Sequence, residues 1–209
     1  MRLAKSGRCA GMIVTACAML MMMTGCSDDR EVLFDTTGSE KIDAERALVL
    51  DNIAKLAAGK NLADPDNVVT YHGAVDALIA RGAAIETQLC EAVAGNDDWG
   101  VRLGAVEVLK AVGTRNCVET LLGALEDPQP LVALNADYLL RELTKYSVIP
   151  QENEPPKNNV PAVPKRDPND LALDADERIW SEWHAENKVA LHTAWEAWWR
   201  DNKDTITIK

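Results

Sequence analysis

The middle of the sequence repeats itself at a fixed spacing, and this repetition limits the folds that the chain can adopt. The stretch GAVDALIARGA, residues 73–83, aligns with GAVEVLKAVGT, residues 104–114, at an offset of 31. A third copy follows at the same offset, with Val132, Leu134, Ala136 and Leu140 in place of Val101, Leu103, Ala105 and Leu109. A unit of this length is one supersecondary element, and it buries its apolar face only by stacking on its neighbours.

Each copy has the apolar spacing of a helix. In the second copy one helix face is formed by Val101, Ala105, Val108, Leu109 and Val112, at i, i+4, i+7, i+8 and i+11. A second helix is expected after each of the first two copies. Its apolar stripe is Val118, Leu121, Leu122 and Leu125 in the later copy and Ile85, Leu89, Cys90 and Val93 in the earlier one, where Glu86 interrupts the stripe. The copies therefore predict helical hairpins.

Residues that begin and end helices agree with this assignment. Asp64-Pro65 and Asp127-Pro128 each predict an N-cap followed by a proline in the first turn, and Ala94-Gly95 predicts a helix end. Residues 41–59 do not align with the repeat, but they also predict a helix. Its apolar face is Ile42, Leu48 or Val49, Ile53 and Leu56. We interpret this helix as the amino-terminal cap that stacked repeats need.

The stretch DDWGVRLGAVEVLKAVG, residues 97–113, resembles the HEAT repeat in the short form found in phycobilisome-lyase-like proteins. The resemblance is carried by Asp98, Val101, Arg102, Ala105 and Leu109, and it covers about residues 65–146. It implies an all-α fold in which residues 41–146 form a short right-handed α-solenoid of HEAT-like hairpins, and most such proteins are protein-binding scaffolds. The arginine position holds Tyr71 in the first copy and Ala133 in the third, so the resemblance implies one step of the family's Asp-to-Arg ladder.

Five of the six tryptophans lie in WSEWHAENKVALHTAWEAWWRDNK, residues 180–203, within a segment, residues 169–209, that predicts one helix. Six of the nine prolines lie between Pro150 and Pro168, so residues 147–168 predict an extended or disordered linker. We expect the last helix to fold back and cover the third copy, which lacks a second helix. Its buried stripe would contain Trp180, Trp183, Leu191 and Trp198, with Trp195 and Trp199 at the edge. Alternatively, Trp195 and Trp199 bind a glycan or a peptide.

The first 25 residues have the pattern of a secretory signal. Arg2, Lys5 and Arg8 precede an apolar run of roughly 16 residues, which is shorter than the ~20 that a spanning helix needs. The residues MTGC, 23–26, resemble the lipobox of bacterial lipoproteins, in which the cysteine is acylated and becomes the first mature residue. The resemblance implies that Cys26 anchors the protein in a lipid bilayer and that residues 26–40 form a tether. An ordinary cleaved signal and an uncleaved anchor are the alternatives.

By the same resemblance, Ser27 after the acylated cysteine favours the outer membrane, with the protein facing the periplasm. Removal of residues 1–25 leaves 19 basic and 33 acidic residues, a net charge of about −14. Such a charge argues against nucleic acid as a partner, because phosphate binding requires basic surface.

No catalytic or metal-binding constellation can be assembled from the sequence, so we predict no enzymatic activity, no metal and no cofactor. The histidines are His72, His184 and His192, and a surface role is expected for each; the last two are too far apart on one helix, ~12 Å, to share a metal. Cys90 and Cys117 both align with apolar core positions. Their expected α-carbon separation of ~12 Å disfavours a disulfide, although an oxidising compartment would permit one.

These observations predict a membrane-tethered, non-catalytic protein-binding scaffold or adaptor of the bacterial cell envelope. The partner would be an envelope protein that the sequence does not identify. The alternative is a lipoprotein that binds cell-wall glycan or peptide through Trp195 and Trp199.

Overall fold

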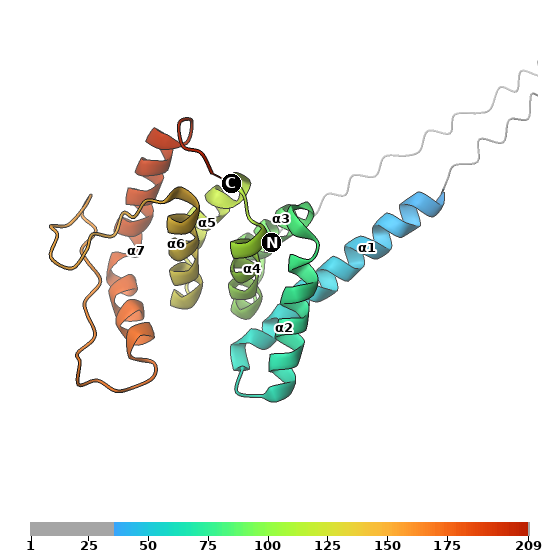
Figure 1. The fold of residues 1–209 in the computed structure, drawn as a ribbon, viewed down its shortest axis with the longest axis horizontal. Helices are drawn as coiled ribbons and strands as arrows, with labels where there is room; N and C mark the ends of the chain where they lie inside the picture. Colours follow the sequence, from blue (N-terminus) through green and yellow to red (C-terminus); the bar gives the residue numbers. More distant parts are fainter. Residues whose placement is uncertain (1–35, 209) are drawn as a thin grey trace, which may run out of the picture. The chain divides into compact units, whose positions relative to one another are not determined.

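The computed structural model describes residues 36–208, and every helix or strand assigned within this range is a helix (Figure 1). The prediction of an all-α protein is therefore confirmed. The chain divides into two units, Met1–Thr36 and Thr37–Lys209. Among the residues that are described, no helix is both long and apolar enough to cross a membrane. The predicted signal sequence and Cys26 lie outside the described residues.

The helices that the repeat predicted pack in two rows. The first helix of each copy is α2 (Pro65–Ile79), α4 (Trp99–Val112) or α6 (Pro130–Thr144), and α4 packs between the other two (Figure 1). The second row consists of α3 (Glu86–Gly95), α5 (Val118–Ala124) and α7 (Ala175–Asn202), with α5 in contact with both neighbours. Contacts of α3 with α4, of α5 with α6, and of α6 with α7 join the rows. Helix α7 thus supplies the second helix that the third copy lacks.

The turns before α4 and α6 are alike, and a similar hydrogen bond lies in the first turn of α2, whose N-cap is Asp64. In each turn a carboxylate or amide oxygen accepts a hydrogen bond from the backbone N–H two residues later. The pairs are Asp64 with Asp66 (2.9 Å), Asn96 with Asp98 (2.9 Å) and Asp127 with Gln129 (2.8 Å). These hydrogen bonds satisfy backbone donors at the start of each first helix.

One predicted helix start is wrong in position. Asp64 is the N-cap of α2 and Pro65 follows it, as predicted, and α3 ends at Gly95. Helix α6, however, begins at Pro130 with Gln129 as its N-cap, so Asp127-Pro128 lies before it. Gln129 is extended because it precedes Pro130, and the residue before a proline is disfavoured in the helical region, so α6 begins at the proline.

The apolar positions shared by the copies form the core. Val101, Ala105 and Leu109 of α4 are buried, and so are their equivalents in α6, Val132, Ala136 and Leu140. In the second row, Leu89, Val118, Leu121 and Leu125 are buried. Ile85, which was expected to take the place of Glu86 in the apolar stripe of the second helix, is buried. Glu86 is buried as well, because its carboxylate accepts hydrogen bonds from the backbone N–H and the hydroxyl of Thr114.

The amino-terminal helix is longer than predicted and less closely packed. Helix α1 (Thr36–Lys55) includes residues 36–40, which the sequence assigned to the tether, and a short 3₁₀ helix, η1 (Leu56–Asn61), follows it. Val49, Ile53 and Leu56 are buried, whereas Ile42 and Leu48 are exposed. The contacts with α2 and α4 come from η1. Helix α1 therefore covers less of the first copy than its predicted apolar face suggested.

Two glycines at equivalent positions of the repeat have different roles. A methyl group on Gly104 would lie 2.8 Å from the Cβ atom of Leu56, so this glycine permits the close approach of η1 to α4. A methyl group on Gly73, which is exposed on α2, would meet nothing within 4 Å. We expect Gly104→Ala to destabilise the protein by about 1–3 kcal/mol through overpacking. Gly73→Ala should stabilise it by about 0.4–1 kcal/mol, because alanine loses less backbone entropy on folding. Thermal unfolding of the two variants measures both effects, and changes of the same sign would contradict this assignment.

The proline-rich segment contains no helix, as predicted, but it packs against the core. Residues 145–174 connect α6 to α7 in an irregular conformation. Val148 and Val160 in this segment are completely buried, and Val163 packs against the core. Helix α7 begins at Ala175 rather than at residue 169, and it ends at Asn202. The expected folding back of the last helix onto the third copy is confirmed by its contacts with α6.

Candidate functional site

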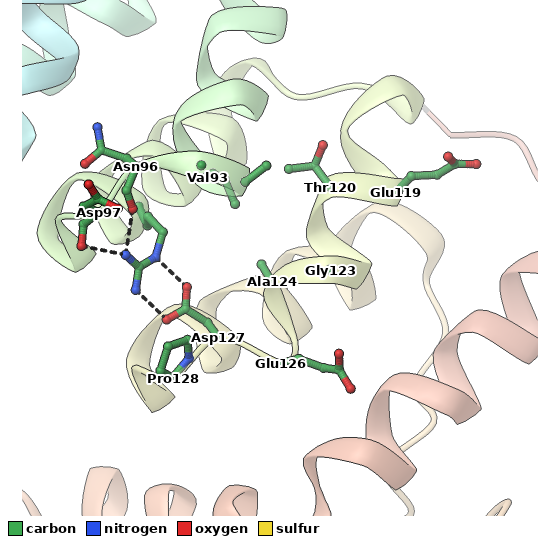
Figure 2. A pocket seen from close by; sticks show the side chains of 13 residues that line it. Val93, Asn96, Asp97, Glu119, Thr120, Gly123, Ala124, Glu126, Asp127 and Pro128 are labelled. Carbon is green, nitrogen blue, oxygen red and sulfur yellow. Dashed lines mark hydrogen bonds and ion pairs between the residues drawn. The ribbon is translucent and has the colours of Figure 1, made fainter. Parts of the chain in front are cut away.

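Two hollows lie on the exposed side of α5, and we call them together the α5 groove. The larger one, about 610 Å³, lies between the carboxyl end of α3 and α5 (Figure 2). Its lining includes Val93, Asn96, Asp97, Arg102, Glu119, Thr120, Gly123, Ala124, Glu126, Asp127 and Pro128. The smaller one, about 380 Å³, lies between α5 and α7 and is lined by Glu119, Leu122, Gly123, His192, Glu196, Trp199, Arg200 and Lys203. Because Glu119 and Gly123 line both hollows, the two meet at α5.

Helix α5 forms a short and low wall between the hollows. It has seven residues, and Gly123 in its second half is exposed. A Cβ atom built on Gly123 would meet nothing within 4 Å. Because Gly123 has no side chain, nothing obstructs the surface of α5 between the two hollows.

One side of the larger hollow is held in place by Arg102. Its Nε and Nη2 atoms donate to the two carboxylate oxygens of Asp127 at 2.6 and 2.8 Å, a bidentate arrangement. Its Nη1 atom donates to the backbone oxygens of Asn96 and Asp97, at 2.8 and 3.1 Å (Figure 2). The carboxylate of Asp127 raises the pKa of Arg102 further above its ordinary value. A single guanidinium thus ties the turn before α4 to the turn before α6.

The pairing of Arg102 with Asp127 was not predicted. The sequence singled out Asp98 and Arg102 from the HEAT pattern, and it treated Asp127 only as a helix cap. Asp98 is the N-cap of α4, and its carboxylate pairs with Lys60 at 2.6 Å, which lowers the pKa of Asp98. Asp127 aligns with Asn96 at the repeat offset, and this alignment was the available signal that Asp127 lies in an equivalent turn.

The larger hollow of the α5 groove carries negative charge that is only partly neutralised, whereas Arg200 and Lys203 line the smaller one together with Glu119 and Glu196. Arg102 neutralises Asp127, but among the described residues no lysine or arginine forms an ion pair with Asp97, Glu119 or Glu126. Glu126 lies 3.6 Å from Nδ1 of His192, and Nε2 of the same ring lies 3.5 Å from Glu196. The larger hollow therefore presents exposed carboxylates around a partly apolar floor that contains Val93 and Ala124.

The structure buries both tryptophans that the sequence offered as a binding surface. Trp195 has no exposed surface, and its Nε1 atom donates to Asp137 at 2.8 Å. Trp199 is 7% exposed, and the guanidinium of Arg115 lies over its ring at 5.2 Å from the centroid. Trp195 therefore has no open face for a sugar or a peptide, and the small exposed part of Trp199 lines the smaller hollow.

The expected order of burial among the tryptophans is wrong. Trp180 and Trp183 are buried, as expected, but Trp198 is partly exposed and stacks on Tyr146 with ring centroids 4.7 Å apart. Trp195 and Trp199, which were expected at the edge of the stripe, are buried. The reason is that α7 packs against both α5 and α6, so it buries a wider face than one helical stripe.

A buried carboxylate joins α6 to α7. Asp137 is completely buried on α6, where it accepts the Trp195 hydrogen bond. The Nε atom of Arg141 lies 2.9 Å from its Oδ2 atom, in an ion pair that lacks hydrogen-bond alignment. Burial raises the pKa of Asp137, although Arg141 and the Trp195 N–H oppose this shift. The charged form is thus disfavoured in the folded protein.

We expect Asp137 to make stability depend on pH. A carboxyl group whose pKa is higher in the folded state favours folding fully below its unfolded pKa of about 3.9, and this contribution is lost as the pH rises through the folded pKa. Asp137→Asn keeps an oxygen that can accept the Trp195 hydrogen bond but cannot ionise. The free energy of unfolding of the wild type, relative to the Asn variant, should therefore fall as the pH rises from about 4. Denaturant titrations of both proteins over this range measure it, and parallel curves would contradict the assignment.

The histidines and cysteines lie in different environments. The expected surface role is wrong for His184, which is buried with Nε2 2.7 Å from the backbone oxygen of Leu125. His72 is exposed, and His192 is partly exposed. Cys90 and Cys117 are free thiols, and burial raises the pKa of Cys117 to about 12. Within the described part of the chain, no group of histidine, cysteine and acidic side chains is placed to hold a metal ion.

Comparison of the chain with models of known protein families gave no match, and comparisons with curated proteins and with solved structures gave none either.

Proposed function

We propose that this protein is a lipid-anchored, non-catalytic protein-binding scaffold of the bacterial cell envelope, and that its two rows of helices form a short HEAT-like solenoid. The repeat offset, the matching turns before α4 and α6 and the packing of α4 between α2 and α6 support the solenoid. The observation that carries the binding role is the α5 groove. It lies on the row of second helices, and it is open at Gly123.

A photo-crosslinking amino acid at Thr120, inside the groove, tests the binding role in the native envelope. The same amino acid at Tyr138 is the matched control, because Tyr138 is exposed on the row of first helices, away from the groove. We expect position 120 to capture one discrete envelope protein that position 138 does not capture. Equal capture from both positions, or capture from neither, would contradict a scaffold that binds through this groove.

The proposed lipid anchor is Cys26. Ser27, the residue after it, favours the outer membrane, with the protein facing the periplasm. Cys26→Ser should abolish acylation, because a serine hydroxyl is a much weaker nucleophile than a thiolate. We expect this variant to accumulate as an uncleaved precursor or as a soluble form. Membrane fractionation and mass measurement check this, and a mature-sized, membrane-bound Cys26→Ser protein would exclude the lipid anchor.

The alternative function is glycan or peptide binding through Trp195 and Trp199. The complete burial of Trp195 gives it no support, and Trp199 offers only the 7% exposed part of its surface, at the smaller hollow. No catalytic arrangement was derived from the sequence, and the proposed scaffold requires none.

A further inference from the structure

The larger hollow of the α5 groove carries an excess of carboxylates that a partner must complement, whereas the smaller hollow combines Glu119 and Glu196 with Arg200 and Lys203. Asp97, Glu119 and Glu126 are exposed at the larger hollow, and no lysine or arginine of the described residues pairs with them. Asp127, the fourth carboxylate of this hollow, is already neutralised by Arg102. A partner that covered Asp97, Glu119 and Glu126 with apolar or acidic side chains would desolvate these carboxylates without supplying a cation, which is unfavourable.

The shape of the groove favours an extended chain over a compact domain. The two hollows share Glu119 and Gly123 in their linings, and Gly123 presents no side chain between them. A peptide backbone can therefore pass over α5 at Gly123. Val93, Ala124 and Pro128 line the larger hollow, and the aliphatic stems of lysine or arginine can pack on such surfaces while their charged ends reach carboxylates.

We infer that the α5 groove binds a cationic peptide segment, whose lysine or arginine side chains pair with Asp97, Glu119 and Glu126 while its backbone crosses α5 at Gly123. This inference rests on the proposed scaffold function and specifies the chemistry of the partner. The segment belongs to the envelope protein that the scaffold holds. Anionic partners are disfavoured, because the same carboxylates would repel them.

Binding of a short fluorescent peptide of alternating arginine and serine tests this inference. The acylated, full-length protein is held in nanodiscs of uncharged lipid, so that the peptide finds no anionic membrane. Glu119→Lys combined with Glu126→Lys should weaken binding at least about tenfold, because each change replaces an attraction by a repulsion. The control pair, Asp76→Lys combined with Glu182→Lys, changes the net charge equally at exposed positions outside the groove. It should alter the dissociation constant by less than about threefold, because distant exposed charges are screened by salt.

A variant that adds bulk without changing the charge tests whether the peptide crosses α5 at Gly123. Gly123→Trp fills the open position without changing the net charge and should abolish peptide binding. Gly123→Ala adds one methyl group in open space and should bind as the wild type does. Circular dichroism and thermal unfolding of both variants show whether the fold is retained.

Three results would overturn the inference: equal weakening by the groove pair and the control pair, unchanged binding by a folded Gly123→Trp protein, or equal binding of a glutamate-and-serine peptide. If one of these occurs while Thr120 still crosslinks a discrete envelope protein, the scaffold function stands and the cationic partner is wrong. If the crosslink from Thr120 is also absent, the scaffold function fails with it.

Discussion

Trp195→Ala is expected to be the most destabilising single substitution in α7. Truncation of a fully buried tryptophan typically costs about 3–5 kcal/mol. The change also leaves the completely buried Asp137 without its hydrogen-bond donor, which costs about 1–3 kcal/mol more. Since domains of this size are stable by about 5–15 kcal/mol, the variant should unfold partly at ambient temperature or melt at least about 10 °C lower. Calorimetry or circular dichroism measures this.

Two further variants identify the cause of the loss. Trp195→Phe keeps an aromatic ring beside Tyr146 but has no N–H for Asp137, so its stability should lie between those of the wild type and Trp195→Ala. Trp198→Ala removes a partly exposed ring and should cost much less than Trp195→Ala. If Trp198→Ala destabilised the protein as strongly as Trp195→Ala, the register of α7 on α6 described above would be wrong.

The second large effect is expected for Arg102→Ala. The side chains of Arg102 and Asp127 are only 12% and 6% exposed, so removal of the guanidinium leaves a buried carboxylate without its cation. Breaking such a pair from one side costs about 3–5 kcal/mol. The backbone oxygens of Asn96 and Asp97 lose a donor in the same step. The free energy of unfolding, from denaturant titration, should fall by this amount.

Lys60→Ala is the matched control for Arg102→Ala. The ion pair of Lys60 with Asp98 has a similar distance, 2.6 Å, but both side chains are about one third exposed. Exposed pairs contribute about 0–1 kcal/mol, so Lys60→Ala should change stability little. Arg102→Lys should fall between the two, because an ammonium group cannot bind both oxygens of Asp127 in a bidentate manner. Equal effects of Arg102→Ala and Lys60→Ala would show that burial does not strengthen the Arg102 pair.

The parts of the fold that were predicted correctly are those in which residues recur at a short, regular spacing in the sequence. Val101, Ala105 and Leu109 recur at helical spacing and again at the repeat offset, so their burial followed from the sequence. Asp64 with Pro65 marked the start of α2 because capping depends on neighbouring residues. Signals of this kind act within one helix or one turn, and they need no knowledge of tertiary packing.

The parts that were missed depend on contacts between distant segments. Trp195 is buried because α6 presents Asp137 at the place where α7 packs, and the period of α7 alone does not contain this information. In the candidate site, Asp127 meets Arg102 across 25 residues of chain. The opening at Gly123 depends equally on how α3 and α7 flank α5. The sequence therefore indicated the row of second helices, but not the groove on it.

The position of α7 in the chain has a consequence for the order in which the protein folds. Hydrogen bonds from Trp180, His184 and Trp195 join α7 to residues that lie between 50 and 59 positions earlier in the sequence. Closing a loop of this length costs entropy before any contact repays it. During synthesis, the face of α6 that α7 covers stays exposed until the residues around Trp195 have emerged, whereas α4 and α5 already cover the rest. A chain interrupted before that point is therefore a natural target for chaperones and proteases, whereas the finished chain hides the same surface.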